Sequence, residues 1–209
     1  MDATRILLIR HGQSRGNAER RFGGHSPTPL SDLGRAQAET TARALRDEGI
    51  DAIYSSDLLR AVETAAPLAS ATGLRVRTSA AFRERSVGRM EGLTFEAAAE
   101  QFPDEYAALP RRDFDHVLPG GESYRQMLDR SAGELDRAVE AHRGGTLAVF
   151  SHTGTICILA LHLMGALDAP TLRPVWVASS NCGVTRFHLQ HGGLIRVPAV
   201  NDTRHLSGL

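Results

Sequence analysis

Two runs of consecutive apolar residues, each followed by one polar residue and a histidine, most constrain how this chain can fold. The first run covers Ile6 to Ile9 and precedes Arg10-His11-Gly12, and the second covers Leu147 to Phe150 and precedes Ser151-His152. A strand with one face in water alternates apolar and polar residues, so unbroken runs indicate strands that are covered on both faces. Such strands are typical of parallel sheets with helices on either side.

Segments of strand and helix character alternate along the chain. We expect strands at residues 5–10, 52–55, 74–78, 146–150, 175–179, 184–189 and 194–200. We expect helices at 32–48 after an N-cap at Ser31, at 58–71 with an interruption or kink at Pro67, at 94–102, from 122 or 123 to about 142, and at 155–165. Loops are expected at 82–92 and 110–122, and a tail at 201–209. This order predicts an α/β three-layer sandwich, with a mostly parallel central sheet flanked by helices on both faces.

The length of 209 residues fits a single domain over residues 1–209. Within it, residues 91–121 are expected to form an insertion that acts as a lid and sets specificity, because loops of this kind commonly carry binding residues. Candidates to line this lid are Phe95, Phe102, Phe114 and His116.

Composition excludes several classes of function. The net charge is +0, so no overall charge attracts the chain to nucleic acid or to an anionic membrane. All 24 members of the Lys+Arg count are arginine, which excludes a Walker P-loop lysine, a Schiff-base lysine and the S-x-x-K hydrolases. Cys157 and Cys182 are too far apart for a C-x-x-C pair and are expected to be small buried residues. Without a long apolar segment, the chain is expected to be cytoplasmic.

The residues after the two apolar runs suggest a ligand. Open α/β sheets bind ligands beyond the carboxyl ends of their strands, so Arg10, His11 and His152 would face one crevice if the two strands are neighbours. The fixed charge of Arg10 disfavours a metal ion, and H-E-x-x-H is absent, so we expect no metal and no cofactor. Arg60, near the start of a helix, adds a second guanidinium group. Together these residues describe a pocket in which an imidazole attacks a phosphoryl group.

An ordered set of motifs resembles the histidine phosphatase superfamily, in its phosphoglycerate-mutase-like branch. The RHG motif alone would be a weak signal, but the set spans nearly the whole chain in the order of that family. The motifs are RHGQSRGN (10–17), RFGG (21–24), PLSDLG (29–34), SSDLLRAVETA (55–65), FRERSVGRMEG (82–92), PGGES (119–123), SHTG (151–154) and NCGVTRF (181–187).

The resemblance implies a role for each central residue. His11 would be the nucleophile that becomes phosphohistidine, Arg10 and Arg60 would clamp the phosphoryl oxygens with help from Asn17, and His152 would stabilise the transition state. His11 must be neutral to attack, and the two neighbouring guanidinium groups are expected to lower its pKa.

Glu84 would protonate the leaving oxygen and later activate water, since an alkoxide leaves poorly without a proton. Glu91, in the same loop, is the alternative candidate for the proton donor. Otherwise it would be a structural partner for backbone amides. Gly23 and Gly24, in the RFGG motif, are assigned to phosphate binding.

The final phosphoryl acceptor separates two activities. Mutases of this family carry a Tyr where this chain has Val87 and Asn-Lys where it has Thr94-Phe95, which favours a phosphatase acting on small phosphorylated metabolites. Arg111 and Arg112, if they face the crevice, would favour a substrate with a carboxylate or a second phosphate. A 2,3-bisphosphoglycerate-dependent phosphoglycerate mutase is the alternative. A third reading is a non-catalytic phosphate-ester-binding domain, although all five central residues are present.

The expected partner is therefore a small-molecule phosphate ester. No nucleic acid and no membrane are expected as partners, and the sequence leaves room for a homodimer.

Overall fold

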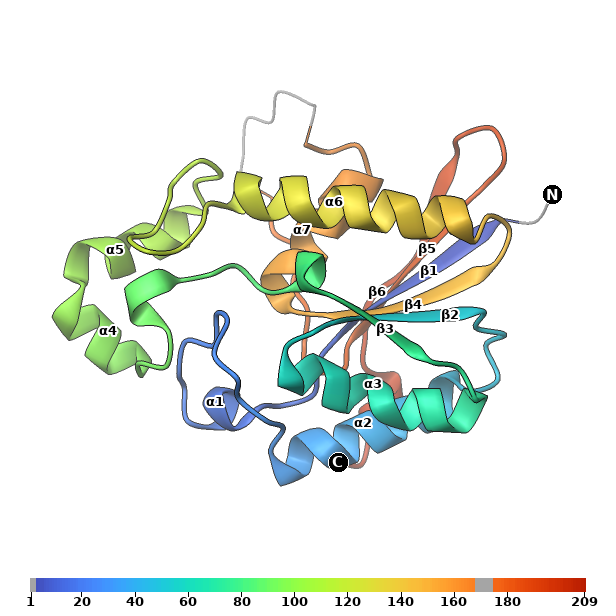
Figure 1. Cartoon of the computed structure of the whole chain (residues 1–209), viewed down its shortest axis with the longest axis horizontal. Coiled ribbons are helices and arrows are strands. Elements are labelled where there is room, and N and C mark those ends of the chain that lie inside the picture. The colour runs from blue at the N-terminus through green and yellow to red at the C-terminus, as the bar shows by residue number, and fades with distance from the viewer. Residues whose placement is uncertain (1–2, 168–174) are drawn as a thin grey trace.

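The central sheet contains six strands in the computed structural model, which describes residues 3–167 and 175–209 (Figure 1). Their order across the sheet is β3-β2-β4-β1-β5-β6. β1 pairs in parallel with β4, and β2 pairs in parallel with both β4 and β3, whereas β1–β5 and β5–β6 are antiparallel. The prediction of a mostly parallel sheet is confirmed. The strands are β1 (Thr4–Arg10), β2 (Ala52–Ser56), β3 (Val76–Ser79), β4 (Thr146–Ser151), β5 (Val184–Leu189) and β6 (Ile195–Asp202).

Helices cover both faces of the sheet, so the predicted three-layer sandwich is also confirmed. Figure 1 shows α6 and α7 on one side and α2 and α3 on the other. Successive residues of β1 alternate between these layers: Ile6 and Leu8 pack with residues of α6 and α7, while Leu7 and Ile9 pack with residues of α2 and α3. The helices are α2 (Asp32–Leu45), α3 (Leu59–Thr72), α6 (Tyr124–Ala141) and α7 (Thr153–Leu163).

Two of these helices have a serine N-cap whose hydroxyl group accepts a hydrogen bond from the first turn. The Ser31 side chain accepts a hydrogen bond from Gly34 N at the start of α2, as expected. Ser123 begins α6 with a reciprocal pair of bonds to Gln126. The structure keeps α3 as one uninterrupted helix through Pro67, so the predicted interruption is wrong. The buried face of α3 packs on the sheet on both sides of the proline, which offsets the loss of one backbone donor.

The sequence analysis missed or misassigned several elements. Two short helices, α1 (Arg15–Ala18) and α5 (Pro103–Ala108), were not predicted, whereas α4 (Phe95–Gln101) was. Residues 175–179 form no strand, because this segment contacts helices and not the sheet edge: Val177 N donates to Cys157 Sγ. The expected tail begins as the end of β6, and a 3₁₀ turn over Arg204–Leu206 then packs on α2.

Three findings complete the description. α4 and α5 lie beyond the carboxyl ends of the parallel strands, next to α1 (Figure 1). Cys157 and Cys182 are buried free thiols, and burial raises the pKa of each to about 11. Within the described ranges, no helix combines the length and the apolar character that crossing a bilayer would require.

A pair of helical glycines tests the packing of α2 against the turn after β1. A Cβ added to Gly34 would collide with the backbone carbonyl of Gln13, whereas one added to Gly133 in α6 would have Arg137 Nη1 as its nearest neighbour, at 3.7 Å. Alanine is the better helix former by up to about 1 kcal/mol. We therefore expect Gly133→Ala to stabilise the protein slightly and Gly34→Ala to lower the free energy of unfolding by about 1–3 kcal/mol. Urea unfolding measures both, and equal effects would contradict this packing.

Candidate active site

The parallel pairing of β1 with β4 brings the two histidines together. Arg10, the last residue of β1, lies opposite Ser151, the last residue of β4, and the residue that follows each strand is a histidine. The ring centroids of His11 and His152 are 5.1 Å apart. A Cβ at Gly12 would lie 2.6 Å from Gly34 O, so only glycine lets the two backbone segments approach this closely. The predicted neighbour relation of the two strands is present, but His152, unlike Arg10 and His11, is not among the residues that line the cavity described below.

Hydrogen bonds fix the proton of His11. Nδ1 lies 2.7 Å from Gly12 O, and because a carbonyl only accepts, Nδ1 carries the hydrogen. Nε2 is the unprotonated nitrogen, and its lone pair accepts a hydrogen bond from Arg60 Nε at 3.3 Å. The pKa of His11 is well below its ordinary value, first because the ring is buried and then because Arg60 and Arg10 are close. The direction agrees with the sequence analysis, but burial and not the arginines is the main cause.

Arg60 is placed by α3 with its guanidinium group buried. Two of its nitrogens donate to Ser26 O and Gly24 O, and the third donates to His11. A guanidinium group has five N–H donors, so two are left for a ligand. Burial lowers the pKa of Arg60 to about 10, which keeps it charged at neutral pH.

Arg10 presents a donor without a protein partner. Its Nη1 donates to Ser179 O at 2.6 Å, but its buried Nε has no acceptor among the described residues. His152 is in the same situation: the residue is 0% exposed, its Nε2 is 2.8 Å from Ser56 Oγ, and its Nδ1 has no partner within the described part of the chain. Buried polar groups are normally satisfied, so a buried guanidinium N–H without an acceptor, on a residue that lines the cavity, indicates a place for an anion.

Asn17 lies at the edge of this group, in the first helix after β1. Its Oδ1 accepts from Ser14 N and also from Asn181 Nδ2, at 3.1 and 3.3 Å. Asn181 Nδ2 further donates to His11 O at 3.0 Å. The sequence analysis quoted the NCG motif without assigning Asn181 a role, and a polar amide before a glycine was the available signal.

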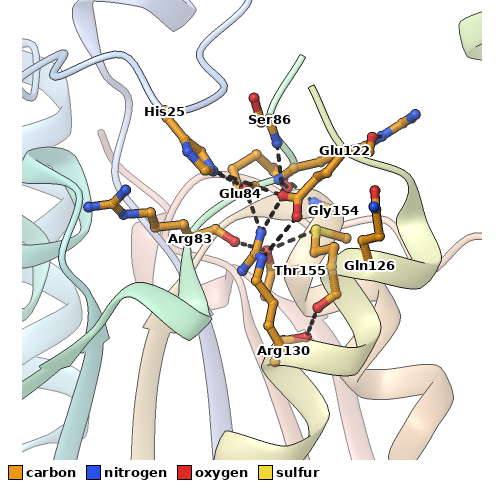
Figure 2. A network of polar contacts seen from close by, with 12 residues as sticks. His25, Arg83, Glu84, Ser86, Glu122, Gln126, Arg130, Gly154 and Thr155 are labelled. Atoms are coloured by element: carbon orange, nitrogen blue, oxygen red, sulfur yellow. Dashed lines mark hydrogen bonds and ion pairs between the residues drawn. The ribbon is translucent and has the colours of Figure 1, made fainter. Parts of the chain in front are cut away.

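Glu84 reaches the crevice from the loop after β3. Its Oε2 accepts from Gly154 N at 3.0 Å and its Oε1 from Arg85 N at 2.9 Å (Figure 2). The carbonyl of Glu84 accepts from His25 Nε2 and from Arg130 Nη2, both at 2.9 Å. The backbone and the carboxylate of Glu84 are therefore both held in place.

Arg130 connects this loop to α6. It forms an ion pair with Glu122, whose Oε1 accepts from Ser86 N at 3.0 Å (Figure 2). Glu91, in contrast, accepts from Ser86 Oγ and Val87 N and is not among the residues that line the cavity. Glu91 thus has the contacts of a structural partner for backbone amides.

A cavity of about 350 Å³ opens over these groups. Its lining includes Arg10, His11, Asn17, Gly23, Gly24, Arg60 and Glu84, and further out four aromatic rings, those of Phe22, Phe95, Tyr124 and Trp176. Arg112 also lines it, whereas Arg111 is exposed and lies outside the lining. His152 lies behind His11 and does not line the cavity. Within residues 3–167 and 175–209, no three His, Cys, Asp or Glu side chains are placed to hold a metal ion.

Comparison with known proteins identifies the family. Residues 6–203 match the family model described as histidine phosphatase superfamily (branch 1). The chain belongs to the histidine phosphatase superfamily.

Several members of this superfamily resemble the chain over most of its length. It is 33% identical to the metal-independent phosphoserine phosphatase of Arabidopsis thaliana, over 100% of this chain and 85% of that protein. It is 39% identical to phosphoglycerate mutase-like protein 4 of the same plant, over 75% of this chain and 69% of that protein. The solved structure of a mycobacterial glucosyl-3-phosphoglycerate phosphatase has a TM-score of 0.86 and 31% identity, covering 95% of this chain and 99% of the other.

The two buried imidazoles of this site make the stability of the protein depend on pH. The pKa values of His11 and His152 are well below 6.5, because both rings are desolvated beside Arg60 and Arg10. Below about pH 6.5 the unfolded chain therefore binds more protons than the folded chain, and stability falls as the pH drops towards the folded pKa values. Each imidazole contributes at most about 1.4 kcal/mol per pH unit in that range.

We expect the free energy of unfolding to decrease between pH 7 and pH 5, as measured with urea in phosphate-free buffer. The double variant His11→Gln/His152→Gln should show a clearly weaker dependence, and the variant of the exposed His191, His191→Gln, should behave like the parent protein. A double variant with an undiminished dependence would contradict this origin.

Proposed function

We propose that this protein hydrolyses phosphate monoesters of small metabolites through a phosphohistidine formed on Nε2 of His11. One observation carries the proposal: the Nε2 lone pair is held beside Arg60 Nε at 3.3 Å, in a crevice where Arg10 Nε has no acceptor among the described residues. A phosphoryl group would supply the missing anion and the electrophile at once. The names of two relatives support this, since they denote phosphatases of phosphoserine and glucosyl-3-phosphoglycerate.

In the first step, His11 Nε2 attacks phosphorus, and the bond from phosphorus to the ester oxygen breaks. The carboxyl group of Glu84 gives its proton to that oxygen, so the product leaves as a neutral alcohol. Arg10, Arg60 and His152 stabilise the charge on the non-bridging oxygens. The proton on Nδ1 stays on its bond to Gly12 O.

In the second step, water attacks the phosphohistidine. The Glu84 carboxylate takes a proton from that water, the bond from phosphorus to Nε2 breaks, and inorganic phosphate is released. His11 returns to its neutral form and Glu84 to its protonated form. The two steps together consume one ester and one water and yield one alcohol and one phosphate.

The outer lining of the cavity supports a phosphatase over a mutase. Val87 and Phe95 stand where the mutases carry Tyr and Lys, and both line the cavity, so apolar surface replaces two polar contacts. Arg112 donates to Tyr124 Oη at 2.7 Å and lies 4.1 Å from the Trp176 ring centroid. It forms no ion pair within the described residues, so its charge is open to a second anionic group of the substrate.

Phosphoglycerate mutase is the second candidate, because one relative is named phosphoglycerate mutase-like and Arg112 could hold a substrate carboxylate. The two activities use the same phosphorylated histidine. They differ in whether water or a second oxygen of the substrate receives the phosphoryl group.

Phosphate release from phosphoserine, sugar phosphates, phosphoglycerates and nucleotides tests the proposal. We expect turnover of at least one monoester, resistance to chelators, and an acid-labile phosphoenzyme trapped with labelled substrate. His11→Ala should abolish both turnover and trapping, because it removes the attacking nitrogen. Ordinary activity in His11→Ala would overturn the assignment. Interconversion of phosphoglycerates with bisphosphoglycerate as primer, without phosphate release, would show a mutase instead.

A comparison of Glu84→Gln with Glu91→Gln tests the proton donor. We expect Glu84→Gln to lower kcat by about 10²–10⁴-fold and to change the shape of its pH profile, because an amide cannot exchange the proton. Glu91→Gln should keep the shape of the profile, since the Glu91 carboxylate accepts from Ser86 Oγ and Val87 N and does not line the cavity. The reverse result would assign the role to Glu91.

A further inference from the structure

Ser56, the last residue of β2, contacts the His152 ring at Nε2. The residue is 0% exposed, and its Oγ is 2.8 Å from His152 Nε2. The same oxygen accepts a hydrogen bond from Leu58 N at 3.2 Å. Ser56 contacts His152 at Nε2, whereas the ring nitrogen without a partner among the described residues is Nδ1.

The position of the hydroxyl proton decides which nitrogen of His152 is protonated. Leu58 N already occupies one lone pair of Ser56 Oγ as a donor, and within the described chain His152 Nε2 is the single acceptor within reach of the hydroxyl hydrogen. If Nε2 carried the proton and donated instead, both the buried hydroxyl hydrogen and the Nδ1 lone pair would lack a partner among the described residues, whereas the other arrangement leaves only the Nδ1 hydrogen without one. Each unsatisfied buried group costs about 1–3 kcal/mol. The favoured arrangement has Ser56 O–H donating to Nε2 and the ring proton on Nδ1.

We infer that Ser56 is a positioning residue, which holds His152 as the Nδ1–H tautomer and so presents a neutral hydrogen-bond donor to the phosphoryl group. Nδ1 is the buried atom of His152 that has no partner within the described residues. It belongs to a ring whose centroid is 5.1 Å from that of the His11 ring. The inference rests on the proposed function for the role of His152 but not for its tautomer.

The opposite tautomer would be harmful to the proposed reaction. A lone pair on Nδ1 would face the oxygens of the phosphoryl group, and two acceptors repel each other. With Nδ1 protonated, the ring donates without itself bearing a charge, while Arg10 and Arg60 supply the charge. The hydroxyl of Ser56 thereby selects the useful form without contacting the substrate.

Nitrogen-15 NMR of the imidazole rings tests the tautomer directly in the ligand-free protein. His152→Gln identifies the signals of His152 among the nine histidines. We expect Nδ1–H in the parent protein and in Ser56→Thr, which keeps the hydroxyl, and a shift towards Nε2–H in Ser56→Ala. The matched control is Ser55→Ala, because Ser55 is equally buried but its Oγ donates to Ser56 O. Nε2–H in the parent protein, or an unchanged tautomer in Ser56→Ala, would overturn the inference.

Kinetics test the consequence. Ser56→Ala should lower kcat by about 10–100-fold with little change in KM, a loss typical for removal of an orienting partner. The loss should be smaller than that of His152→Ala, which removes the donor itself. Ser56→Thr should restore most of the rate, and Ser55→Ala should keep it. If the parent protein hydrolyses no ester, the proposed function fails while the NMR result stands. If the parent is active and Ser56→Ala is too, the positioning role fails alone.

Discussion

The parallel pairing of β1 with β4 is the constraint on which the rest of the structure depends. It aligns two strands whose paired residues, from Arg5 with Thr146 to Arg10 with Ser151, are 141 positions apart in sequence, and it places His11 and His152 side by side. Both strands are buried on both faces, so neither can slide without exposing apolar side chains. The position of the nucleophile is therefore secured by the most buried part of the fold.

The second requirement is to hold cationic groups in a buried crevice without ion-pair partners. Backbone carbonyls meet part of this need: Gly24 O and Ser26 O accept from Arg60, and Ser179 O accepts from Arg10. Carbonyls satisfy donors but leave the positive charge in place, whereas a carboxylate would neutralise it. Burial is the main cause of the lowered pKa of His11, the retained charge lowers it further, and that charge would attract the anion that the proposed function requires.

Loop 23–26 couples two parts of the site that are distant in sequence. Its carbonyls bind Arg60, and the side chain of His25 donates to Glu84 O. Arg130 binds the same carbonyl from α6. Hydrogen bonds thus join Arg60, loop 23–26 and the backbone of Glu84, and Figure 2 shows the part of this network around Glu84.

Local patterns in the sequence predicted the buried strands, the cap at Ser31 and the parallel sheet, because unbroken apolar runs and capping residues act over a few residues. They failed at residues 175–179, where apolar residues of strand character pack on helices, and at α5, which begins directly after α4. The sequence by itself determined which chemical groups were available: two histidines after strand ends, arginines but no lysines, and Glu84 with Glu91 as the alternative proton donor. Only the tertiary structure decided that Arg112 lines the cavity and Arg111 does not, and that Ser56 lies behind His152, because these contacts depend on loops and strands that meet across the whole fold.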